Sequence, residues 1–377
     1  MKSATRWTRT MIATLAFGLL PAAPVSAEYR NGVRFDPGRE MIARAEGAPV
    51  ELDRVAGLVG QWDVEIVLPR SEGDAVKAKG MAEITFMNRG HALMENFYSA
   101  SFDGHDLAAI HFLGFNPASK RWFLAGADSW DEHAWIADGD FAGKKLVFSN
   151  SSRLGGGVTL TEVRYTLEQS TPDALRLKME SSTDGGATFS TTQERSYSRR
   201  KASADFMEPA STHGSPSPDR FPEAAAFDFL IGEWNATHDM TFPDGRRAQW
   251  VSNGTGVYAL NGSAVMEFNW FDLDPSLPDA ATTILRLYNR GMRRWETLYV
   301  PNRGHSILHF GGVQEGDEIV LHAFEAGASG RLSRWVFHDI KKDAYQWYGE
   351  ASTDRGQSWT RTWLIDVERK PAEPAGD

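Results

Sequence analysis

The sequence repeats itself, and this repeat limits the folds that the chain can adopt. Residues 57–62 (GLVGQW) match residues 229–234 (FLIGEW) at an offset of 172, and residues 180–189 (ESSTDGGATF) match residues 350–359 (EASTDRGQSW) at an offset of 170. Shorter matches lie between them in nearly the same register, such as Met94-Glu95 with Met266-Glu267. Matches that keep one register over a whole unit indicate a tandem duplication. One fold of roughly 150 residues, a usual domain size, therefore has to occur twice.

The repeat divides the 377 residues into segments. The two units run over 50–200 and 222–370, and Pro and Ser residues give 201–221 the composition of a linker. Residues 28–49 form a polar extension without a counterpart in the second unit, and 371–377 form a tail.

The first 27 residues have the pattern of a secretory signal peptide. Three basic residues come first, an apolar run follows over 11–20, and small residues at 25–27 (VSA) offer a cleavage site. The apolar run is too short to cross a bilayer, which takes about 20 helical residues. We expect cleavage before Glu28, a periplasmic or secreted protein, and no membrane span after cleavage.

The composition excludes several classes of site. The chain has no cysteine, so it has no disulfide, no thiolate-bound metal and no cysteine nucleophile. Its formal net charge of -10 argues against nucleic acid as a partner, because nucleic acids bind to basic patches. We therefore expect an acidic globular protein whose partner is not a nucleic acid.

Within each unit the pattern is that of β-strands. Short runs that alternate apolar and polar residues, such as 161–165, 175–179 and 319–324, are separated by turn residues. Long helical periodicity is absent, although 222–226 (PEAAA) predicts a short helix where the second unit begins. A unit with many strands favours a closed antiparallel barrel, because closure removes exposed edges. The predicted fold class is all-β, with two tandem antiparallel barrels that are each opened by a short helix.

The start of each unit resembles a signature of the calycin superfamily, which includes the lipocalins. This signature is Gly-x-Trp, and it occurs at 60–62 (GQW) and at 232–234 (GEW). Residues 114–122 (GFNPASKRW) are similar to a second motif, found in bacterial lipocalin-like domains of unknown function. The second unit departs from it, because 287–291 (LYNRG) lacks the Gly and the Pro. The resemblance implies exported, tandem lipocalin-like barrels whose binding sites differ.

The resemblance also implies a role for Trp62 and Trp234. The calycin tryptophan closes one end of the barrel, and here it would pack against an arginine of a late strand, such as Arg199 or Arg369. The heme-binding nitrobindins share this barrel, but they use an extended glycine-rich motif and a late-strand histidine that neither unit has. No cofactor is therefore implied.

A second repeated motif, at 182–189 and 352–359, resembles the Asp box of sialidase propellers. A propeller needs four or more blades, whereas this motif occurs once near the end of each unit. An Asp side chain can accept backbone N–H groups, and Gly tolerates positive φ. We interpret Asp184 and Asp354 as turn residues rather than catalytic residues.

Charged residues at matched positions are candidates for a site inside a barrel. Two interpretations stay open for the Arg and Glu residues: ion pairs across strands on the outer surface, or buried pairs that orient a ligand. Alternation favours the solvent side for Glu180 and is ambiguous for Glu350. The matched positions are Glu95 with Glu267, Arg164 with Arg334, and Glu180 with Glu350.

The second unit is rich in tryptophan, with eight of the chain's 13. Such density is typical of a barrel core, and it also suits a cavity for an apolar or planar ligand. Trp270, Trp335 and Trp347 lie on predicted strands in the middle of the unit. The predicted ligand-binding residues are Glu95, Arg164, Trp122, Glu267, Trp270, Arg334, Trp335 and Trp347.

Three histidines of the second unit flank a predicted hairpin. If Glu315-Gly316 forms its two-residue turn, His309 lies across from His322, and His305 projects from the same face. Imidazoles placed in this way could bind zinc, copper or iron. The alternative is exposed or hydrogen-bonded histidines, because a one-residue slip in register moves His322 to the opposite face.

The leading hypothesis is an exported protein that binds a small hydrophobic or aromatic molecule in a barrel cavity. The first alternative is a cavity enzyme, a lyase, isomerase or hydrolase, with Glu267, Glu350 and His309 as candidate catalytic residues. The second is a structural or interaction module whose barrels are filled by side chains. Cavity volume separates this last class from the other two, and the oligomeric state stays open.

Overall fold

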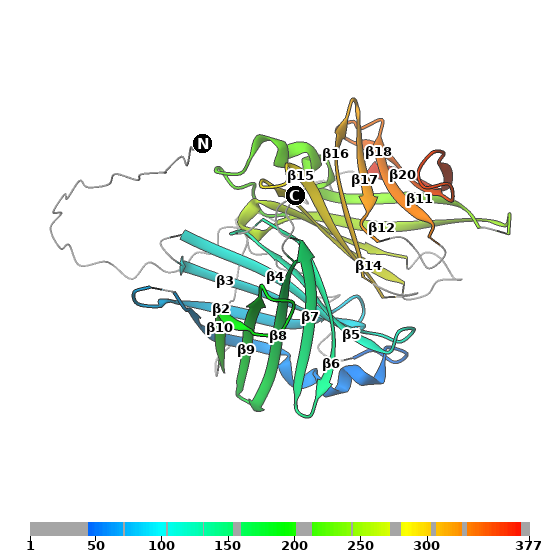
Figure 1. Cartoon of the computed structure of the whole chain (residues 1–377). Coiled ribbons are helices and arrows are strands. Elements are labelled where there is room, and N and C mark those ends of the chain that lie inside the picture. Colours follow the sequence, from blue (N-terminus) through cyan, green and yellow to red (C-terminus); the bar gives the residue numbers. More distant parts are fainter. Residues whose placement is uncertain are drawn as a thin grey trace, which may run out of the picture.

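The chain folds into two closed β-barrels, each made of ten antiparallel strands, which lie one above the other in Figure 1. The computed structural model describes residues 44–70, 72–102, 105–130, 132–153, 160–200, 213–242, 244–271, 280–302, 307–325 and 330–370. The prediction of an all-β fold with two tandem antiparallel barrels is confirmed. The signal-peptide pattern, most of the polar extension and the tail lie outside the described residues.

The first barrel is an up-and-down arrangement in which each strand pairs with its neighbours in sequence. Strand β1 closes the barrel by pairing with β10, which places Trp62 opposite Arg199. The strands are β1 (Gly60–Leu68), β2 (Val76–Met87), β3 (Ala92–Phe102), β4 (His105–Asn116), β5 (Arg121–Asp128), β6 (Trp135–Ala142), β7 (Lys145–Arg153), β8 (Leu160–Thr171), β9 (Ala174–Ser182) and β10 (Ser190–Arg199).

The second barrel repeats this topology, and β11 closes it on β20 with Trp234 opposite Arg369. Its strands are β11 (Gly232–Thr241), β12 (Arg247–Ala259), β13 (Ala264–Trp270), β14 (Ala281–Asn289), β15 (Arg294–Pro301), β16 (Leu308–Glu315), β17 (Glu318–Ala323), β18 (Leu332–His338), β19 (Ala344–Ser352) and β20 (Thr360–Arg369).

Short 3-10 helices cover one end of each barrel. Helices η1 (Val50–Arg54) and η2 (Ala56–Leu58) precede the first barrel, and η3 (Pro222–Leu230) precedes the second. Leu52 and Phe227 are fully buried, so these helices contribute to the barrel cores. The predicted opening helix is confirmed, with 3-10 geometry; a further 3-10 turn, η4 (Leu260–Gly262), follows β12.

An arginine packs on each signature tryptophan. The guanidinium carbon of Arg369 lies 4.1 Å from the Trp234 ring centroid, and Arg199 lies 4.1 Å from that of Trp62. Arg369 Nη1 also donates to the carbonyl of Ile231 at 2.6 Å. Gly232 precedes this tryptophan by two residues with φ of +117°, and a Cβ there would collide with Nη1 of Arg369. The predicted contacts of Trp62 with Arg199 and of Trp234 with Arg369 are confirmed.

The two Asp motifs are turns, as predicted. Asp184 Oδ1 accepts from the backbone N–H of Thr188 at 2.9 Å, and Asp184 Oδ2 accepts from its hydroxyl at 2.6 Å. Asp354 makes the same two bonds with Ser358 at 2.9 and 2.6 Å. These hydrogen bonds lower the pKa of both carboxyl groups well below the ordinary value, so both turns are held by carboxylates.

The two barrels share an apolar cluster between their outer faces. Strands β3, β4 and β5 supply Met94, Ile110, Phe112 and Ala125, and strands β13, β14 and β15 supply Met266, Leu285, Leu298 and Val300. Asn88 crosses the boundary, because its Nδ2 donates to the carbonyl of Val300 at 2.7 Å and its Oδ1 accepts from the Thr283 hydroxyl at 2.8 Å. The units are therefore packed together, which the sequence analysis did not anticipate.

A buried carboxylate, Glu296 of β15, joins the barrels at the rim of this cluster. Its side chain is 0 % exposed, and its Oε2 lies 2.9 Å from His133 Nδ1 and accepts from the N–H of Ala134 at 2.8 Å, both in the first barrel. Arg294 Nη2 donates to its Oε1 at 2.9 Å. Burial alone would raise the pKa of Glu296, but the hydrogen bond with His133 and the nearby His309 lower it well below the ordinary value. We call these residues the inter-barrel joint: His133, Ala134, Arg294 and Glu296.

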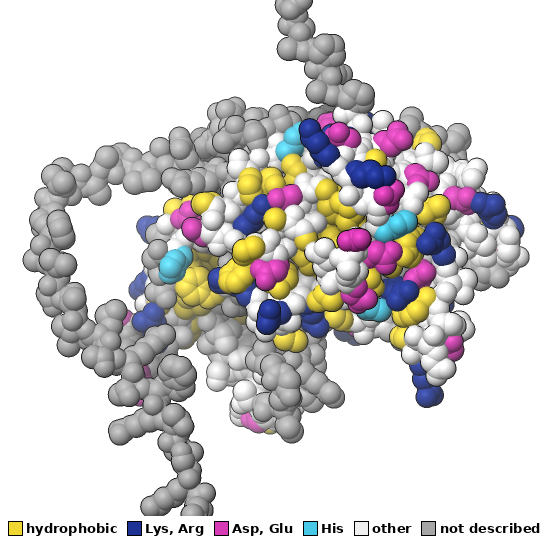
Figure 2. Space-filling model, turned by 90° about the horizontal axis from the view of Figure 1, so that it is seen from above, with side chains coloured by type: hydrophobic (Ala, Val, Ile, Leu, Met, Phe, Trp, Pro, Cys, Tyr) yellow, Lys and Arg dark blue, Asp and Glu magenta, His cyan; other side chains and the backbone are white. Residues whose placement is uncertain are grey.

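The outer surface carries both signs of charge. In the view of Figure 2, acidic and basic side chains lie interspersed with apolar ones. Cross-strand pairs contribute to this pattern, such as Arg176 Nη2 with Glu194 Oε2 at 2.7 Å.

Candidate functional site

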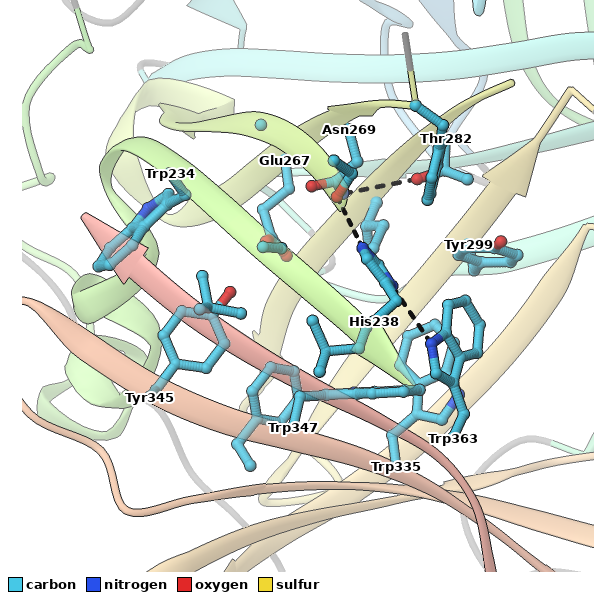
Figure 3. A pocket seen from close by; sticks show the side chains of 18 of the residues that line it. Trp234, His238, Glu267, Asn269, Thr282, Tyr299, Trp335, Tyr345, Trp347 and Trp363 are labelled. Atoms are coloured by element: carbon cyan, nitrogen blue, oxygen red, sulfur yellow. Dashed lines mark hydrogen bonds between the residues drawn. The ribbon is translucent and has the colours of Figure 1, made fainter. Parts of the chain in front are cut away.

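The second barrel encloses a cavity of about 90 Å³ whose walls are mainly aromatic (Figure 3). Every strand of the barrel except β16 and β17 contributes to it, because every second residue of a strand points inward. The main lining residues are Trp234, His238, Ser252, Glu267, Asn269, Thr282, Arg286, Tyr299, Trp335, Phe337, Tyr345, Trp347 and Trp363.

The first barrel is filled more completely, with a cavity of about 40 Å³. Val64 and Ile66 occupy the positions in β1 that correspond to Ala236 and His238 in β11. Ala236 lines the second cavity, whereas Val64 and Ile66 are packed in the first core. The smaller alanine side chain is thus one physical reason why the second cavity is larger.

Three tryptophans form one aromatic wall of the second cavity. The ring centroids of Trp335 and Trp347 are 5.5 Å apart, and those of Trp347 and Trp363 are 5.2 Å apart. Both contacts are edge-to-face, with interplanar angles of 71° and 82°. Edge-to-face packing fixes the ring orientations, so this wall presents a rigid apolar surface to a ligand.

The two ring nitrogens of His238 are engaged by neighbours in a way that favours one tautomer of the neutral imidazole. The indole N–H of Trp363 donates to Nδ1 at 3.2 Å, so Nδ1 accepts and the proton of the neutral imidazole sits on Nε2. Nε2 lies 2.7 Å from Ser252 Oγ and therefore donates to it. Figure 3 shows His238 between Trp363 and the Asn269 side of the cavity. Because both nitrogens are engaged in this way, His238 is not placed to take a proton from Ser252.

A buried ion pair lies at the end of the cavity near η3. Arg286 is 2 % exposed and its Nη1 contacts Oε2 of Glu267. The guanidinium also lies 5.2 Å from the ring centroid of Phe227 in η3. Burial lowers the pKa of Arg286 to about 9, so the guanidinium remains protonated beside the Glu267 carboxylate at neutral pH.

The first barrel has a different partner for the matched carboxylate. His111 Nδ1 lies 2.6 Å from Glu95 Oε2, and both residues line the small cavity. Burial would raise the pKa of Glu95, but the hydrogen bond with His111 and the charge of Arg195 lower it below the ordinary value. The two barrels thus keep an inward carboxylate at the same place and pair it with different residues of matched strands, His111 in β4 and Arg286 in β14.

Four of the predicted ligand-binding residues line a cavity. Glu267, Trp335 and Trp347 line the second cavity, and Glu95 lines the first.

The other four lie elsewhere. Trp122 is 1 % exposed and packs in the first core between Phe115 and Phe141. The placement of Trp270 in the pocket was wrong, because alternation along β13 puts it on the outer face with Met266 and Phe268, against the inter-barrel cluster.

Arg164 and Arg334 form cross-strand ion pairs, but the partner carboxylates are largely covered, since only 9 % of the Glu180 side chain and 11 % of the Glu350 side chain are exposed. Arg164 Nη2 lies 2.9 Å from Glu180 Oε2, and Arg334 Nε lies 2.6 Å from Glu350 Oε2. In β8 and β9 the neighbours Tyr165 and Leu177 point into the core, so the Arg164 pair faces outward. Neither arginine, and neither partner carboxylate, lines one of the two cavities.

The predicted register of the histidine hairpin was wrong. The turn is Gly316-Asp317, with Gly316 at φ of +65°, so His322 pairs with Gly311 and not with His309. His309 stacks edge-to-face on Phe324, with its Nε2 3.8 Å from Glu296 Oε2, and His322 lies against Trp359. His305 lies outside the described residues. Within the described ranges, no group of three His, Asp or Glu side chains is arranged to hold a metal ion.

The sequence analysis missed His238, Arg286 and Tyr345. A signal for the first existed, because Trp234 points inward and alternation along β11 then sends Ala236 and His238 inward as well. No comparable signal existed for Arg286, whose inward direction depends on the register of β14 against β13.

Comparisons with known proteins assign no function to this chain. Residues 51–199 match a family model described as a protein of unknown function (DUF1579), and no curated protein matches the chain. Solved structures include a protein of unknown function from the DUF3598 family of Nostoc punctiforme, with 11% identity over 85% of this chain and 100% of that chain, and a TM-score of 0.24.

Two further structures align with less than half of the chain. Rv2717c from M. tuberculosis has 13% identity over 41% of this chain and 99% of that chain, with a TM-score of 0.30. The S-type phycobiliprotein lyase CPES from Guillardia theta has 12% identity over 39% and 92%, with a TM-score of 0.28. All three scores are low, so the fold rests on the strand pairing of this chain, which fits a lipocalin or calycin type of barrel. None of the described helices is long and apolar enough to cross a membrane.

Proposed function

We propose that the protein is an exported binding protein that holds a small, planar, mainly apolar molecule in the cavity of the second barrel. The observation that carries this proposal is the cavity of about 90 Å³ with its wall of Trp335, Trp347 and Trp363. Export is supported by the signal-peptide pattern of residues 1–27.

The volume limits the size of the ligand. An engineered apolar cavity of about 150 Å³ binds benzene. A cavity of about 90 Å³ therefore suits a ligand whose enclosed part is no larger than one aromatic ring. The first barrel, at about 40 Å³, has room for only a few water molecules.

The arrangement of polar groups favours binding over catalysis. Glu267 is neutralised by Arg286, and His238 donates to Ser252 instead of accepting its proton. Neither residue presents a free base to a molecule in the cavity. The third hypothesis, a barrel filled by side chains, suits the first barrel better than the second.

A titration of the full chain with ethylbenzene and acetophenone, followed by tryptophan fluorescence, tests the proposal. Both compounds carry one ring, and binding beside Trp347 and Trp363 should change the emission of the protein. Ala236→Ile fills the cavity with a side chain like those of the first barrel and should abolish the change. Thr237→Ile is the matched control, because Thr237 is exposed on the outer face of the same strand. Failure of both compounds to bind at millimolar concentration, or equal binding by the Ala236→Ile protein, overturns the proposal.

A further inference from the structure

Two tyrosine hydroxyls open into the second cavity without a hydrogen-bond partner among the described residues. Tyr299 of β15 and Tyr345 of β19 both line the cavity, and Tyr345 is 7 % exposed. Their rings are fixed by neighbours, since Tyr299 packs edge-to-face on Trp335 at 5.4 Å and Tyr345 packs on Trp234 at 5.4 Å. Hydroxyls held on fixed rings at the wall of a cavity are suited to bind a polar atom of a ligand.

Both hydroxyls are donors at neutral pH. Burial raises the pKa of Tyr299 to about 12 and raises that of Tyr345 further, so each phenol keeps its proton. The surrounding polar groups also donate. Arg286 has no acceptor atom, and its buried Nε has no partner among the described residues. Ser252 accepts from His238 and so retains its own hydrogen for donation.

The carboxylate and the amide of the cavity each contact a neighbour. Glu267 Oε2 is bound by Arg286, and Asn269 is packed over Gly254 and reaches Thr282 Oγ1 at 3.5 Å. The first barrel lacks the two tyrosine donors, because Leu175 and Gly126 stand where the second barrel has Tyr345 and Tyr299. These two hydroxyls and the Arg286 guanidinium therefore distinguish the second cavity.

We infer that the ligand of the second barrel carries a hydrogen-bond acceptor on its ring, a carbonyl oxygen, that accepts from Tyr299 or from Tyr345, which lie on opposite sides of the cavity (Figure 3). This inference rests on the proposed function and adds the chemical class of the ligand: a one-ring aromatic carbonyl compound. A ligand whose polar group only donates would leave the tyrosine and arginine donors unpaired and is disfavoured.

The matched pair of acetophenone and ethylbenzene tests the inference, because the two differ by the carbonyl oxygen. The quantity to measure is the ratio of their dissociation constants in the full chain, from the fluorescence titration. In the Tyr299→Phe/Tyr345→Phe protein, acetophenone should bind about tenfold more weakly while ethylbenzene binds within about twofold of wild type, because only the donors are removed.

Tyr348→Phe is the control, since the Tyr348 hydroxyl donates to Glu318 at 3.1 Å in a separate apolar cluster. It should leave the ratio unchanged. An equal ratio in the wild-type and Tyr299→Phe/Tyr345→Phe proteins overturns the inference while leaving the proposed function intact. If neither compound binds to the wild-type protein, the proposed function fails, and the inference falls with it.

Discussion

Replacing Glu296 should weaken the packing between the barrels more than replacing an exposed carboxylate does. Its side chain is 0 % exposed and accepts from the Ala134 N–H of the first barrel and from Arg294. Removing one partner of a buried ion pair costs about 3–5 kcal/mol. Arg294 is 28 % and His133 is 42 % exposed, so both can turn to water, and we expect about 3 kcal/mol for Glu296→Ala.

The pH dependence of this loss follows from the lowered pKa of Glu296. A carboxyl group whose pKa is lower in the folded state stabilises the fold fully above its unfolded pKa, about 4.3 for Glu. That stabilisation is lost as the pH falls from there toward the folded pKa. The difference between wild type and Glu296→Ala should therefore be full at pH 7 and smaller at pH 3.5.

Urea denaturation followed by tryptophan fluorescence measures the difference at each pH. Glu315→Ala is the control, because Glu315 is exposed at the end of β16 and its loss should change the free energy of unfolding by less than about 0.5 kcal/mol. If Glu296→Ala and Glu315→Ala change the free energy of unfolding equally at pH 7, the inter-barrel joint does not stabilise the protein. A loss that is equal at pH 7 and 3.5 would refute the electrostatic part of the reasoning.

Three further changes test the closed end and the Asp turns. Gly232→Ala should lower the free energy of unfolding by about 1–3 kcal/mol, because it strains φ and brings Cβ against Arg369. The loss should be larger than that of Gly245→Ala, where φ is +83° but the space around the residue is open. Urea denaturation of the two variants compares these losses. Arg369→Met removes the contact with Trp234 and a hydrogen bond, so we expect a loss of about 2 kcal/mol in urea melts and an altered near-UV circular dichroism spectrum. Asp354→Asn should lower the thermal midpoint at pH 7. The difference from wild type should begin to shrink as the pH falls below the unfolded pKa of Asp, about 3.9, and should continue to shrink toward the lower folded pKa, because only the ionised carboxylate stabilises the turn. An undiminished difference at pH 3 contradicts this account of the turn.

Local patterns in the sequence were sufficient for the strands and the turns. The contact of Trp62 with Arg199 was instead implied by the resemblance to calycins. Alternation over a few residues decides the buried face of β1. The Asp motif carries its own hydrogen bonds within seven residues, so its structure is independent of the rest of the chain. These features were predicted because their causes are local.

The site depends on contacts between residues that are distant in sequence. Trp270 is inside or outside according to the face that Glu267 takes, and that choice depends on the neighbouring strands. His309 does not lie across from His322, because the turn is formed by Gly316-Asp317, one residue later than predicted. Arg286 became the partner of Glu267 only through the register of β13 with β14. No pattern along one strand specifies such pairings.

The packing of the two barrels is a second non-local property. The residues of the inter-barrel cluster are apolar side chains on the outer faces of strands such as β4, whose nearly continuous apolar run is buried on both faces. Their burial requires that two such faces meet, and this is decided by complementary shape between the units. Two barrels could therefore be predicted from the sequence, whereas their interface could not.

The most direct test of the central claim is a crystal structure of the full chain soaked with acetophenone. The account predicts one molecule inside the second barrel, with its ring against Trp347 and Trp363 and its oxygen within hydrogen-bond distance of a tyrosine hydroxyl. It also predicts that the first barrel holds no aromatic molecule, because its cavity of about 40 Å³ is too small. Density for acetophenone in the first barrel or on the outer surface, with an unchanged second cavity, would contradict the claim.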